Sequence, residues 1–313
     1  MTRRYGGLVA ADGVSFEIGR GEMFGLIGPD GAGKTTTLRV TLGLLAPHAG
    51  SVRTCGLEPV RQGALLSRRI GYLSQRFSLY GDLSVDENIG FFAAIHGVAD
   101  WRRRRDQLLE ELRLAPFRRR LAERLSGGMK QKLALACTLI HTPELLVMDE
   151  PTTGVDPVSR RDFWKILSHL QRQEMTIFLT TPYLDEAERC QRIALMDRGK
   201  VLTVSTPGEL REQGGGTVVE ILASPKGRAA ELLAVQQGVA EVEAFGERLH
   251  ATLPAVAAAD GPAASGRLAA SLRAAGIEVV AARAVPPSLE DIFIARVRAR
   301  APAAATATTP HHP

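Results

Sequence analysis

Apolar residues in the first two thirds of the chain form two kinds of pattern, strand-like runs and helix-like spacing, which alternate along the chain. The uninterrupted runs at residues 23–27 and 145–148 have the length of strands that are buried on both faces. Residues 36–45 and 130–139 instead have the apolar spacing of helices. Buried strands that alternate with helices are typical of a parallel sheet covered by helices. The pattern therefore predicts an α/β domain over residues 1–213.

The pattern changes after the three glycines at 214–216, which predict a break between domains. Short strand-like runs and helical segments then follow in the order βαββαβ, which predicts a small α+β domain of the ferredoxin-like type over residues 217–297. The expected strands are 217–222, 239–245, 249–253 and 277–284, and the expected helices are 226–236 and 266–275. Residues 298–313 are rich in Ala, Thr and Pro, so we expect a disordered tail.

The composition is that of an ordinary globular protein, with 45% hydrophobic and 23% charged residues among 313. The longest apolar stretches are too short to span a bilayer, and the start Met-Thr-Arg-Arg-Tyr lacks the apolar region of a secretion signal. We therefore expect a cytoplasmic chain. Cys55, Cys137 and Cys190 are far apart in the sequence, which favours buried thiols over a zinc site or disulfides.

Arginines contribute much of the net charge of +5, and they gather at residues 102–105 and 118–120. These runs flank leucines at helical spacing, at positions 108, 109, 112 and 114. A solvated helix face explains the arrangement better than a binding patch. Surfaces that bind single-stranded nucleic acid also interleave basic residues with aromatic rings, and no aromatic residue interrupts either run. We therefore expect no nucleic-acid partner.

A glycine-rich loop follows the first buried run. Its sequence, Gly28-Pro29-Asp30-Gly31-Ala32-Gly33-Lys34-Thr35, fits the phosphate-loop pattern G-x-x-x-x-G-K-[ST] between a strand and a helix. The glycines let backbone N–H groups close around phosphate oxygens at a helix N-terminus. Lys34 is placed to reach the β- and γ-phosphates of ATP, and Thr35 to hold Mg²⁺ through its hydroxyl. We assign the ATP site to residues 28–35 and Thr36.

Two further motifs lie downstream. Leu125-Ser126-Gly127-Gly128-Met129 precedes a helical segment, so its small residues leave N–H groups free for a second anion. Asp149 and Glu150 end the second buried run and so reach the carboxyl edge of the sheet, where ligands bind. The phosphate loop, the glycine motif and the acid pair, in this order, resemble the motifs of ATP-binding cassette (ABC) ATPases. The resemblance implies a P-loop NTPase cassette whose helical subdomain carries the signature motif.

The resemblance also implies a role for each motif. Asp149 corresponds to the acid that holds Mg²⁺ or its water, and Glu150 to the base that polarises the attacking water. Gln75 corresponds to a glutamine that contacts Mg²⁺ or water and senses a membrane partner. The signature motif at 125–129 would complete the ATP site of a second cassette in a head-to-tail dimer. Asp156 matches the D-loop between the two sites, although a plain turn would also explain it.

Three positions depart from the family pattern or fit it loosely. Tyr5 lies where the family stacks an aromatic ring on adenine, although an ordinary surface tyrosine is nearly as simple an interpretation. Only four residues precede Tyr5 where the family has a whole strand, so either the true start lies upstream or an edge strand is missing. Asp30 replaces an asparagine, which adds a carboxylate near the triphosphate. Pro182 replaces the histidine that contacts the γ-phosphate, and proline offers no donor for that contact.

The proline leaves three arrangements open. Glu150 alone could suffice for hydrolysis in a homodimer. The chain could instead form a heterodimer with a second ABC cassette that has the histidine. It could also be a degenerate half that binds nucleotide with little hydrolysis of its own.

The resemblance covers nearly the whole chain, because residues 288–293 also resemble the C-terminal region of drug-exporting ATPases of the daunorubicin-resistance type. It implies the ATP-hydrolysing subunit of an ABC-2 type exporter, bound to separate membrane permease subunits on the inner face of the cell membrane. The implied cargo is an amphipathic drug, with a polysaccharide or lipid less expected. The alternative is a soluble, non-transport ABC ATPase. Such proteins carry a second cassette with a charged linker, or long coiled coils, and this sequence has neither.

Overall fold

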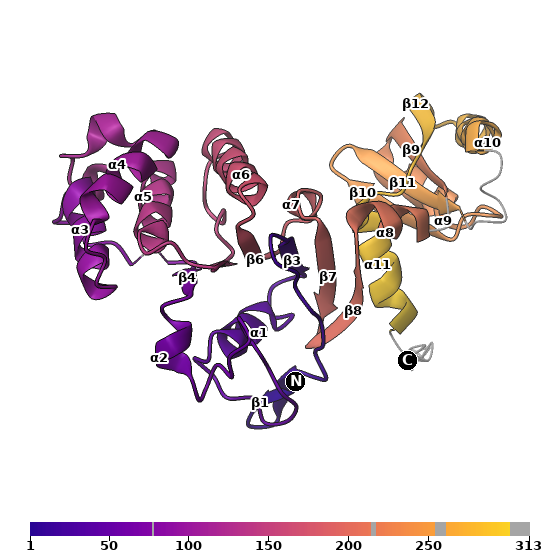
Figure 1. Ribbon diagram of the computed structural model, residues 1–313. Coiled ribbons are helices and arrows are strands. Elements are labelled where there is room, and N and C mark those ends of the chain that lie inside the picture. The colour runs from indigo at the N-terminus through magenta and orange to yellow at the C-terminus, as the bar shows by residue number, and fades with distance from the viewer. Residues whose placement is uncertain (77, 214–216, 254–260, 301–313) are drawn as a thin grey trace, which may run out of the picture. The chain divides into compact units, whose positions relative to one another are not determined.

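The computed structural model describes residues 1–76, 78–213, 217–253 and 261–300 (Figure 1). The chain divides into two compact units, Met1–Thr206 and Pro207–Pro313, and each is treated by itself. Among the helices of the described residues, none combines the length and the hydropathy that a membrane span requires.

A six-stranded sheet forms the core of the first unit. Its strands are β3 (Met23–Ile27), β4 (Ile70–Leu73), β5 (Leu145–Asp149), β6 (Thr176–Thr181), β7 (Arg192–Asp197) and β8 (Lys200–Ser205). The order across the sheet is β4-β5-β6-β3-β7-β8; the first five strands are parallel, and β8 pairs antiparallel with β7. The two apolar runs of the sequence are β3 and β5, and every residue of both strands is buried. The predicted α/β domain with a parallel sheet is confirmed.

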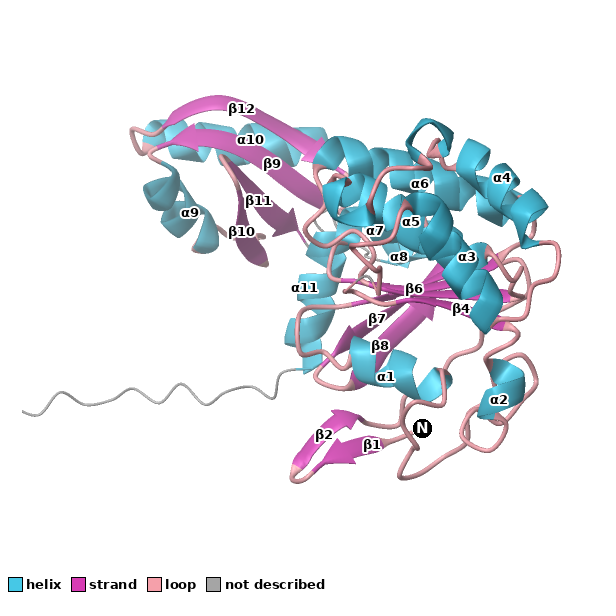
Figure 2. Cartoon of the chain, turned by 90° about the vertical axis from the view of Figure 1, so that its left-hand side faces the viewer, coloured by secondary structure: helices cyan, strands magenta, loops and turns pink. Residues whose placement is uncertain are grey.

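Helices cover both faces of this sheet. Helix α1 (Lys34–Thr41) lies on one face, and α5 (Gly127–Leu139), α6 (Pro157–Arg172) and α7 (Leu184–Ala187) lie on the other (Figure 2). The helix expected over residues 36–45 begins earlier because Gly33 is its N-terminal cap. It also ends earlier, since Gly43 adopts a left-handed φ of 73° that terminates the helix. The helix expected over 130–139 likewise starts sooner, at the cap residue Ser126.

A helical subdomain lies between β4 and β5 in the chain. It contains α3 (Val85–Ile95), α4 (Trp101–Glu111), two short 3-10 helices (Ala115–Phe117 and Ala122–Arg124) and α5. The four leucines at 108, 109, 112 and 114 are buried, as their spacing predicts. Arg105 and Arg118, one from each arginine run, form ion pairs with Asp86 and Asp106. These contacts join α4 and the segment after it to the first turn of α3.

The remaining elements of the first unit are small. Strands β1 (Arg3–Tyr5) and β2 (Leu8–Ala11) form a two-stranded antiparallel hairpin, and α2 (Gly63–Leu66) precedes β4. Cys137 and Cys190 are buried, and burial raises the pKa of both thiols, so they are unreactive core residues. Cys55 is only half-buried, which corrects the expectation that all three thiols are buried.

The second unit begins with α8 (Pro207–Gln213) and contains a four-stranded antiparallel sheet. Its strands are β9 (Thr217–Ser224), β10 (Glu241–Phe245), β11 (Arg248–Leu253) and β12 (Glu278–Val285), in the order β10-β11-β9-β12. Helix α9 (Lys226–Ala234) follows β9, and α10 (Gly261–Ala274) follows β11. This is the βαββαβ order of a ferredoxin-like domain, as the sequence predicts. Leu233 of α9 and Leu268 of α10 share a core with Ile221 of β9.

Helix α11 (Leu289–Arg300) closes the second unit. Its residue Asp291 accepts hydrogen bonds from the N–H and the hydroxyl of Ser288, which caps the helix, and its other carboxylate oxygen lies 3.0 Å from His250 of β11. The helix continues to Arg300, past the expected start of the tail at residue 298. The rest of that expected tail, residues 301–313, lies outside the described residues.

Candidate functional site

The phosphate loop joins β3 to α1, and its glycines are required by close backbone approaches. A Cβ on Gly28 would lie 2.1 Å from the carbonyl oxygen of Met196, and a Cβ on Gly33 would lie 2.1 Å from that of Ala10. Gly33 also has a φ of 101°, which side chains of other residues rarely allow. The loop therefore keeps its shape only with glycine at these two positions. Pro29, Asp30 and Gly31 lie at its exposed tip.

Lys34, the first residue of α1, turns back under this loop. Its side chain is 3% exposed, and its Nζ donates to the carbonyl oxygens of Gly28 (2.8 Å) and Pro29 (3.0 Å). The same Nζ lies 3.2 Å from Oε1 of Glu150. An ammonium held at the N-terminus of a helix inside a glycine loop is suited to bind phosphate oxygens.

The acid pair lies at the carboxyl end of β5, beside the neighbouring strand β6. Asp149 is 2% exposed, and its Oδ1 accepts from the hydroxyls of Thr35 (3.1 Å) and Thr180 (2.7 Å). Glu150 has a positive φ of 46°, and its N–H donates to the carbonyl and to the hydroxyl of Thr180. A non-glycine residue in this conformation is strained, and such strain is common at functional sites. The bend turns the carboxylate of Glu150 toward Lys34.

Gln75 completes the cluster from the segment after β4. Its Nε2 donates to Oε2 of Glu150 over 3.1 Å, although the two residues are far apart in sequence. The structure thus brings together five of the residues that the sequence singles out: Lys34, Thr35, Gln75, Asp149 and Glu150.

The donors at this edge fit Mg²⁺. The hydroxyl of Thr35 and the carboxylate of Asp149 approach the same point from α1 and β5, and both are hard oxygen donors. The amide oxygen of Gln75 is a further oxygen donor in the same cluster. Mg²⁺ usually takes few protein ligands and keeps several waters. Among the described residues, no group of three or more His, Cys, Asp and Glu side chains is arranged to hold a metal ion.

The signature motif forms a separate helix end. Ser126 caps α5, and its hydroxyl accepts from the N–H of Met129 (3.3 Å). A Cβ on Gly128 would lie 2.3 Å from Oγ of Ser159 in α6, so this glycine allows two helices to pack closely. Nothing lies within 4 Å of a Cβ on Gly127. In the described residues, no hydrogen bond or ion pair joins Ser126 to the Lys34 cluster.

Asp156 and Tyr5 have simple local environments. Asp156 caps α6 by accepting from the N–H groups of Val158 and Ser159, and these hydrogen bonds lower the pKa of its carboxyl. Tyr5 ends β1 with 43% of its surface exposed, and the guanidinium of Arg3 lies 5.1 Å from the centre of its ring. An exposed ring of this kind can stack on a base, and its role stays a prediction.

The segment that contains Pro182 rests on a buried carboxylate that the sequence analysis missed. Glu186 of α7 is 1% exposed, and its carboxylate accepts from Thr181 (2.7 Å), from the indole of Trp164 (3.1 Å) and from Thr152. Arg160 lies 3.8 Å from the same carboxylate. Glu186 therefore links three parts of the chain through hydrogen bonds: the segment after Glu150, helix α6 and the end of β6. No signal in the sequence distinguishes Glu186 from the other acids of its segment, because its burial depends on tertiary packing.

Known proteins match both units of the chain. The family described as "ABC transporter" matches residues 11–153, and the family "ATP-binding protein DrrA1-3-like, C-terminal domain" matches residues 206–297. The chain is 36% identical over 295 residues to the daunorubicin resistance ATP-binding protein DrrA3 of Streptomyces coeruleorubidus, covering 93% of this chain and 92% of that protein.

Two other matches cover the cassette. The chain is 40% identical over 215 residues to the probable multidrug ABC transporter ATP-binding protein YbhF of Escherichia coli, covering 68% of this chain but only 37% of that longer protein. A solved dimer of the ATP-binding cassette MJ0796, bound to ADP and Pi, has a TM-score of 0.59 and 25% identity, and the match covers 66% of this chain and 94% of that one. The chain therefore belongs to the ABC transporter family, as an ATP-binding cassette ATPase with a DrrA1-3-like C-terminal domain.

Proposed function

We propose that the chain is the ATP-hydrolysing subunit of an ABC-2 type drug exporter and acts on separate permease subunits. The observation that carries the proposal is the cluster in which Glu150 contacts both Lys34 and Gln75. It places a phosphate-binding cation, a carboxylate base and an amide at one edge of the sheet, as ATP hydrolysis requires. The match to DrrA3 over both units supports drug export.

The chain's own residues divide the work of hydrolysis. Lys34 and the N–H groups of the loop bind and orient the phosphates. Glu150 accepts a hydrogen bond from the attacking water and so directs it at the γ-phosphate, while Gln75 holds the carboxylate of Glu150 in place. Mg²⁺, held through Thr35 and Asp149, would offset the negative charge of the phosphates.

The signature motif supports a dimer in which each chain completes the partner's ATP site. The N-terminus of α5 carries small residues and lies apart from the chain's own phosphate loop, so its N–H groups suit the phosphates of a second cassette. The dimeric state of MJ0796 agrees with this arrangement.

An exposed apolar surface around α3 of the helical subdomain supports contact with a permease. Tyr80, Phe91 and Ile95 are 45%, 37% and 62% exposed, and the rings of Tyr80 and Phe91 meet edge to face at 4.6 Å. Tyr80 follows Gln75 by a few residues, so a protein bound at this surface would affect the position of the catalytic amide. We place the subunit on the cytoplasmic face of the membrane, where ATP is available.

The test has two parts. The purified chain, with a Glu150→Gln variant as control, is first assayed for ATP hydrolysis. The tagged chain is then purified from detergent-solubilised membranes of its own organism, and we expect multispanning permease subunits to accompany it. Hydrolysis without any such subunit would favour a non-transport ATPase instead.

A further inference from the structure

One side chain of the helix that carries the signature motif reaches the segment after Glu150. Gln131 lies on α5, the helix that Ser126 caps, and it is 0% exposed. Its Nε2 donates to the carbonyl oxygen of Pro151 over 2.5 Å. Pro151 directly follows Glu150 in the chain. A buried amide from α5 therefore contacts the backbone beside the carboxylate base.

The other end of this amide has no partner. Oε1 of Gln131 is buried, and within the described residues it forms no hydrogen bond. An unpaired buried oxygen lowers the stability of a folded protein, so an apolar side chain of similar size would suit this position better if packing alone mattered. The amide is best explained by the hydrogen bond that its Nε2 donates to Pro151.

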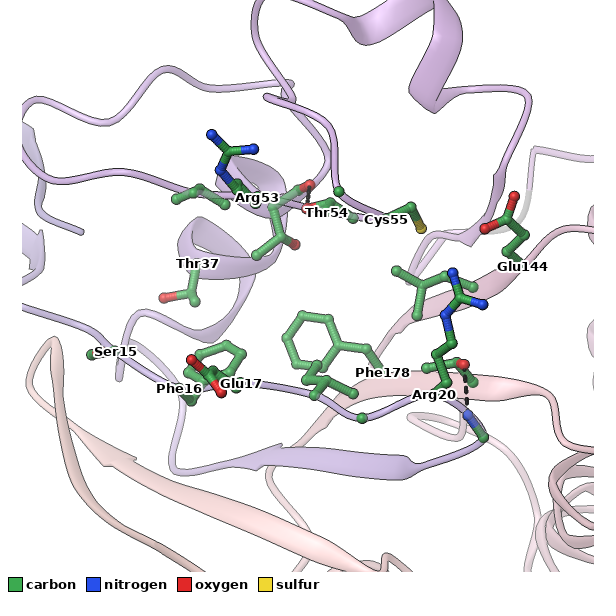
Figure 3. Close-up of a pocket in the computed structure, with 18 of the residues that line it drawn as sticks. Ser15, Phe16, Glu17, Arg20, Thr37, Arg53, Thr54, Cys55, Glu144 and Phe178 are labelled. Carbon is green, nitrogen blue, oxygen red and sulfur yellow. Dashed lines mark hydrogen bonds between the residues drawn. The ribbon is translucent and has the colours of Figure 1, made fainter.

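The free oxygen does not border the large cavity of the first unit. This cavity has a volume of about 1290 Å³, and Figure 3 shows Phe16, Arg53 and Glu144 among the residues that line it. Glu144 lies directly before β5, whereas Pro151 lies beyond the last residue of that strand. The contact of Gln131 with Pro151 is thus at the opposite end of β5, and neither of these two residues lines the cavity.

Pro151 can be held only through its carbonyl group. Proline has no N–H and no polar atom in its side chain, so the carbonyl oxygen is its sole hydrogen-bonding group. Pro151 is buried, and no backbone N–H of the described residues donates to this oxygen. The side chain of Gln131 supplies the donor instead.

The next residue of the segment, Thr152, is held by a second buried side chain. Its hydroxyl donates to the carboxylate of Glu186 in α7. The segment then returns toward the site, because the hydroxyl of Thr153 lies 3.4 Å from Oε2 of Glu150. Gln131 and Glu186 therefore fix two consecutive residues that directly follow the base.

Glu150 requires this support because its backbone is strained. Its φ of 46° is uncommon for a residue with a side chain, and such a conformation persists only where surrounding contacts fix it. On one side the N–H of Glu150 donates to the hydroxyl of Thr180. On the other side the carbonyl of Pro151 accepts from Gln131. The direction of the carboxylate toward Lys34 depends on both contacts.

We propose that Gln131 is a positioning residue for ATP hydrolysis. Its amide holds the carbonyl of Pro151 and thereby keeps Glu150 in the backbone conformation that directs its carboxylate at the attacking water. Gln131 acts through Glu150 of its own chain. The inference rests on the role of Glu150 in the proposed function, and it does not depend on what is transported.

The same helix connects this contact to the second anion site. Ser126 caps the N-terminus of α5, where we propose that a partner's phosphates bind, and Gln131 lies about 7.5 Å further along the axis at 1.5 Å per residue. Because a helix of this length moves as a rigid element, a shift at its N-terminus also shifts the amide that holds Pro151. The helix that meets the partner's ATP thus sets the position of the chain's own base.

Gln131→Met removes the amide and keeps a side chain of similar length. The rate at saturating ATP should fall roughly tenfold, because the carboxylate of Glu150 is no longer held in position. The dissociation constant for ATP should stay within roughly twofold, because Lys34 and the phosphate loop are unchanged. The matched control is Thr138→Val, which removes a hydrogen bond to Ala134 within the same helix and should leave the rate unchanged. Unfolding curves check that both variants are folded.

Mixed dimers show on which chain Gln131 acts. A Lys34→Ala chain is paired with a Ser126→Arg chain by means of two affinity tags. The undamaged ATP site then uses Lys34 and Glu150 of the Ser126→Arg chain and Ser126 of the other chain. Adding Gln131→Met to the Ser126→Arg chain should lower the rate roughly tenfold. Adding it to the Lys34→Ala chain should leave the rate unchanged, because Glu150 of that chain belongs to the damaged site.

Gln131→Asn tests the same contact if the methionine variant does not fold. It keeps an amide on a side chain that is one methylene shorter, so the donor is withdrawn from the carbonyl of Pro151. It should also lower the rate without weakening ATP binding. These comparisons in the homodimer hold whether or not the mixed dimers recover activity.

Three results would overturn the inference. Unchanged hydrolysis by Gln131→Met, when Glu150→Gln is inactive, would exclude the positioning role and leave the proposed function intact. A parallel loss of rate and of ATP affinity would show that Gln131 only maintains the fold. A lower rate with the substitution on the Lys34→Ala chain would show that Gln131 supports the signature motif instead. Equal hydrolysis by the wild type and Glu150→Gln would contradict the proposed role of Glu150 itself, and the inference would fail with it.

Discussion

Lys34 and Glu150 form a nearly buried ion pair, with Nζ and Oε1 3.2 Å apart and side chains 3% and 10% exposed. One partner belongs to the phosphate loop and the other to the acid pair after β5. Phosphate oxygens would compete with the carboxylate for the same ammonium. Nucleotide binding is therefore expected to loosen this pair and to turn Glu150 toward water.

Lys34→Ala and Glu150→Gln should have different effects. The lysine meets phosphates in the ground state, so its loss should weaken ATP binding by tenfold or more, about 1.4 kcal/mol. Under the proposed function the glutamate acts only on the attacking water, so Glu150→Gln should keep ATP affinity, abolish turnover and accumulate an ATP-bound dimer. Equilibrium ATP binding and size-exclusion chromatography measure these effects. Equal ATP affinity of Lys34→Ala and the wild type would contradict the assignment.

Gly33→Ala and Gly31→Ala are matched variants. They distinguish the loss of stability caused by backbone strain from the loss caused by a steric clash. Both glycines have positive φ, so alanine costs roughly 1 kcal/mol at either position. Only at Gly33 would the added Cβ meet backbone, 2.1 Å from the Ala10 oxygen, whereas nothing lies within 4 Å at Gly31. Denaturant unfolding should show the larger loss of stability for Gly33→Ala. Equal losses would mean that the loop relaxes around the new methyl group.

The sequence predicts the parts of the site that depend on short motifs. The phosphate loop, Asp149 and Glu150 are each next to a buried strand, so the strand fixes where the motif lies in the sheet. Parallel strands then bring their carboxyl ends together, which explains why Lys34 and Glu150 meet. Gln75 follows the same rule, because it comes after the neighbouring strand β4.

Contacts that depend on tertiary packing could not be predicted in this way. Glu186 is one acid among several in its segment, and only the packing of Trp164 and Thr152 around it shows that it is buried. The strained φ of Glu150 likewise depends on two hydrogen bonds to Thr180 of the next strand. In the second unit, the βαββαβ order of elements along the chain was predictable from the sequence pattern. The contact of His250 with Asp291 was not.

The stacked rings of His96 and His141 predict a dependence of stability on pH. Their centroids are 3.8 Å apart, and burial lowers the pKa of both imidazoles from the usual 6.5, with His96 lowering that of His141 further. The unfolded chain therefore binds protons more readily than the folded chain. The stability of the neutral pair is fully present above pH 6.5 and is lost as the pH falls through the lower, folded pKa values.

Denaturant unfolding between pH 7.5 and 5 measures this effect. The wild type should lose stability over that interval, because protonation of either ring disrupts the neutral pair. A His96→Gln variant should lose less, because one titrating ring is removed and His141 loses its neighbour. An identical pH profile in both proteins would show that the ring pair does not control acid stability.

Mixed dimers test whether the signature motif serves a partner's ATP. Ser126→Arg places a long charged side chain at the N-terminus of α5, and Lys34→Ala disables the phosphate loop. In a dimer of one variant with the other, one composite site has both defects and the second site has neither. ATPase activity of the mixture should therefore exceed that of each variant alone. If mixed dimers form but activity does not recover, the sites are not shared.

The last prediction concerns Pro182, which follows β6 directly and stands where the family has a histidine. Proline has no side-chain donor and no N–H, so under the proposed function one contact to the transferring phosphate would be missing, while Glu150 and Gln75 remain in place. Loss of one such donor typically costs about 3 kcal/mol of transition-state stabilisation, or roughly a hundredfold in rate. We therefore expect slow hydrolysis by the homodimer.

Pro182→His should raise that rate, because Thr181 and the buried Glu186 hold the segment in position beside the site. The physiological partner would then be a second cassette that has the histidine, and this chain's Ser126 would help to complete the partner's ATP site. The check is the steady-state ATPase rate of the purified wild type and variant, with unfolding curves to show that both are folded. If the wild type alone turns over several ATP per second and Pro182→His gives no gain, the histidine is dispensable in this chain, because Glu150 suffices, and the reason to expect a heterodimer disappears.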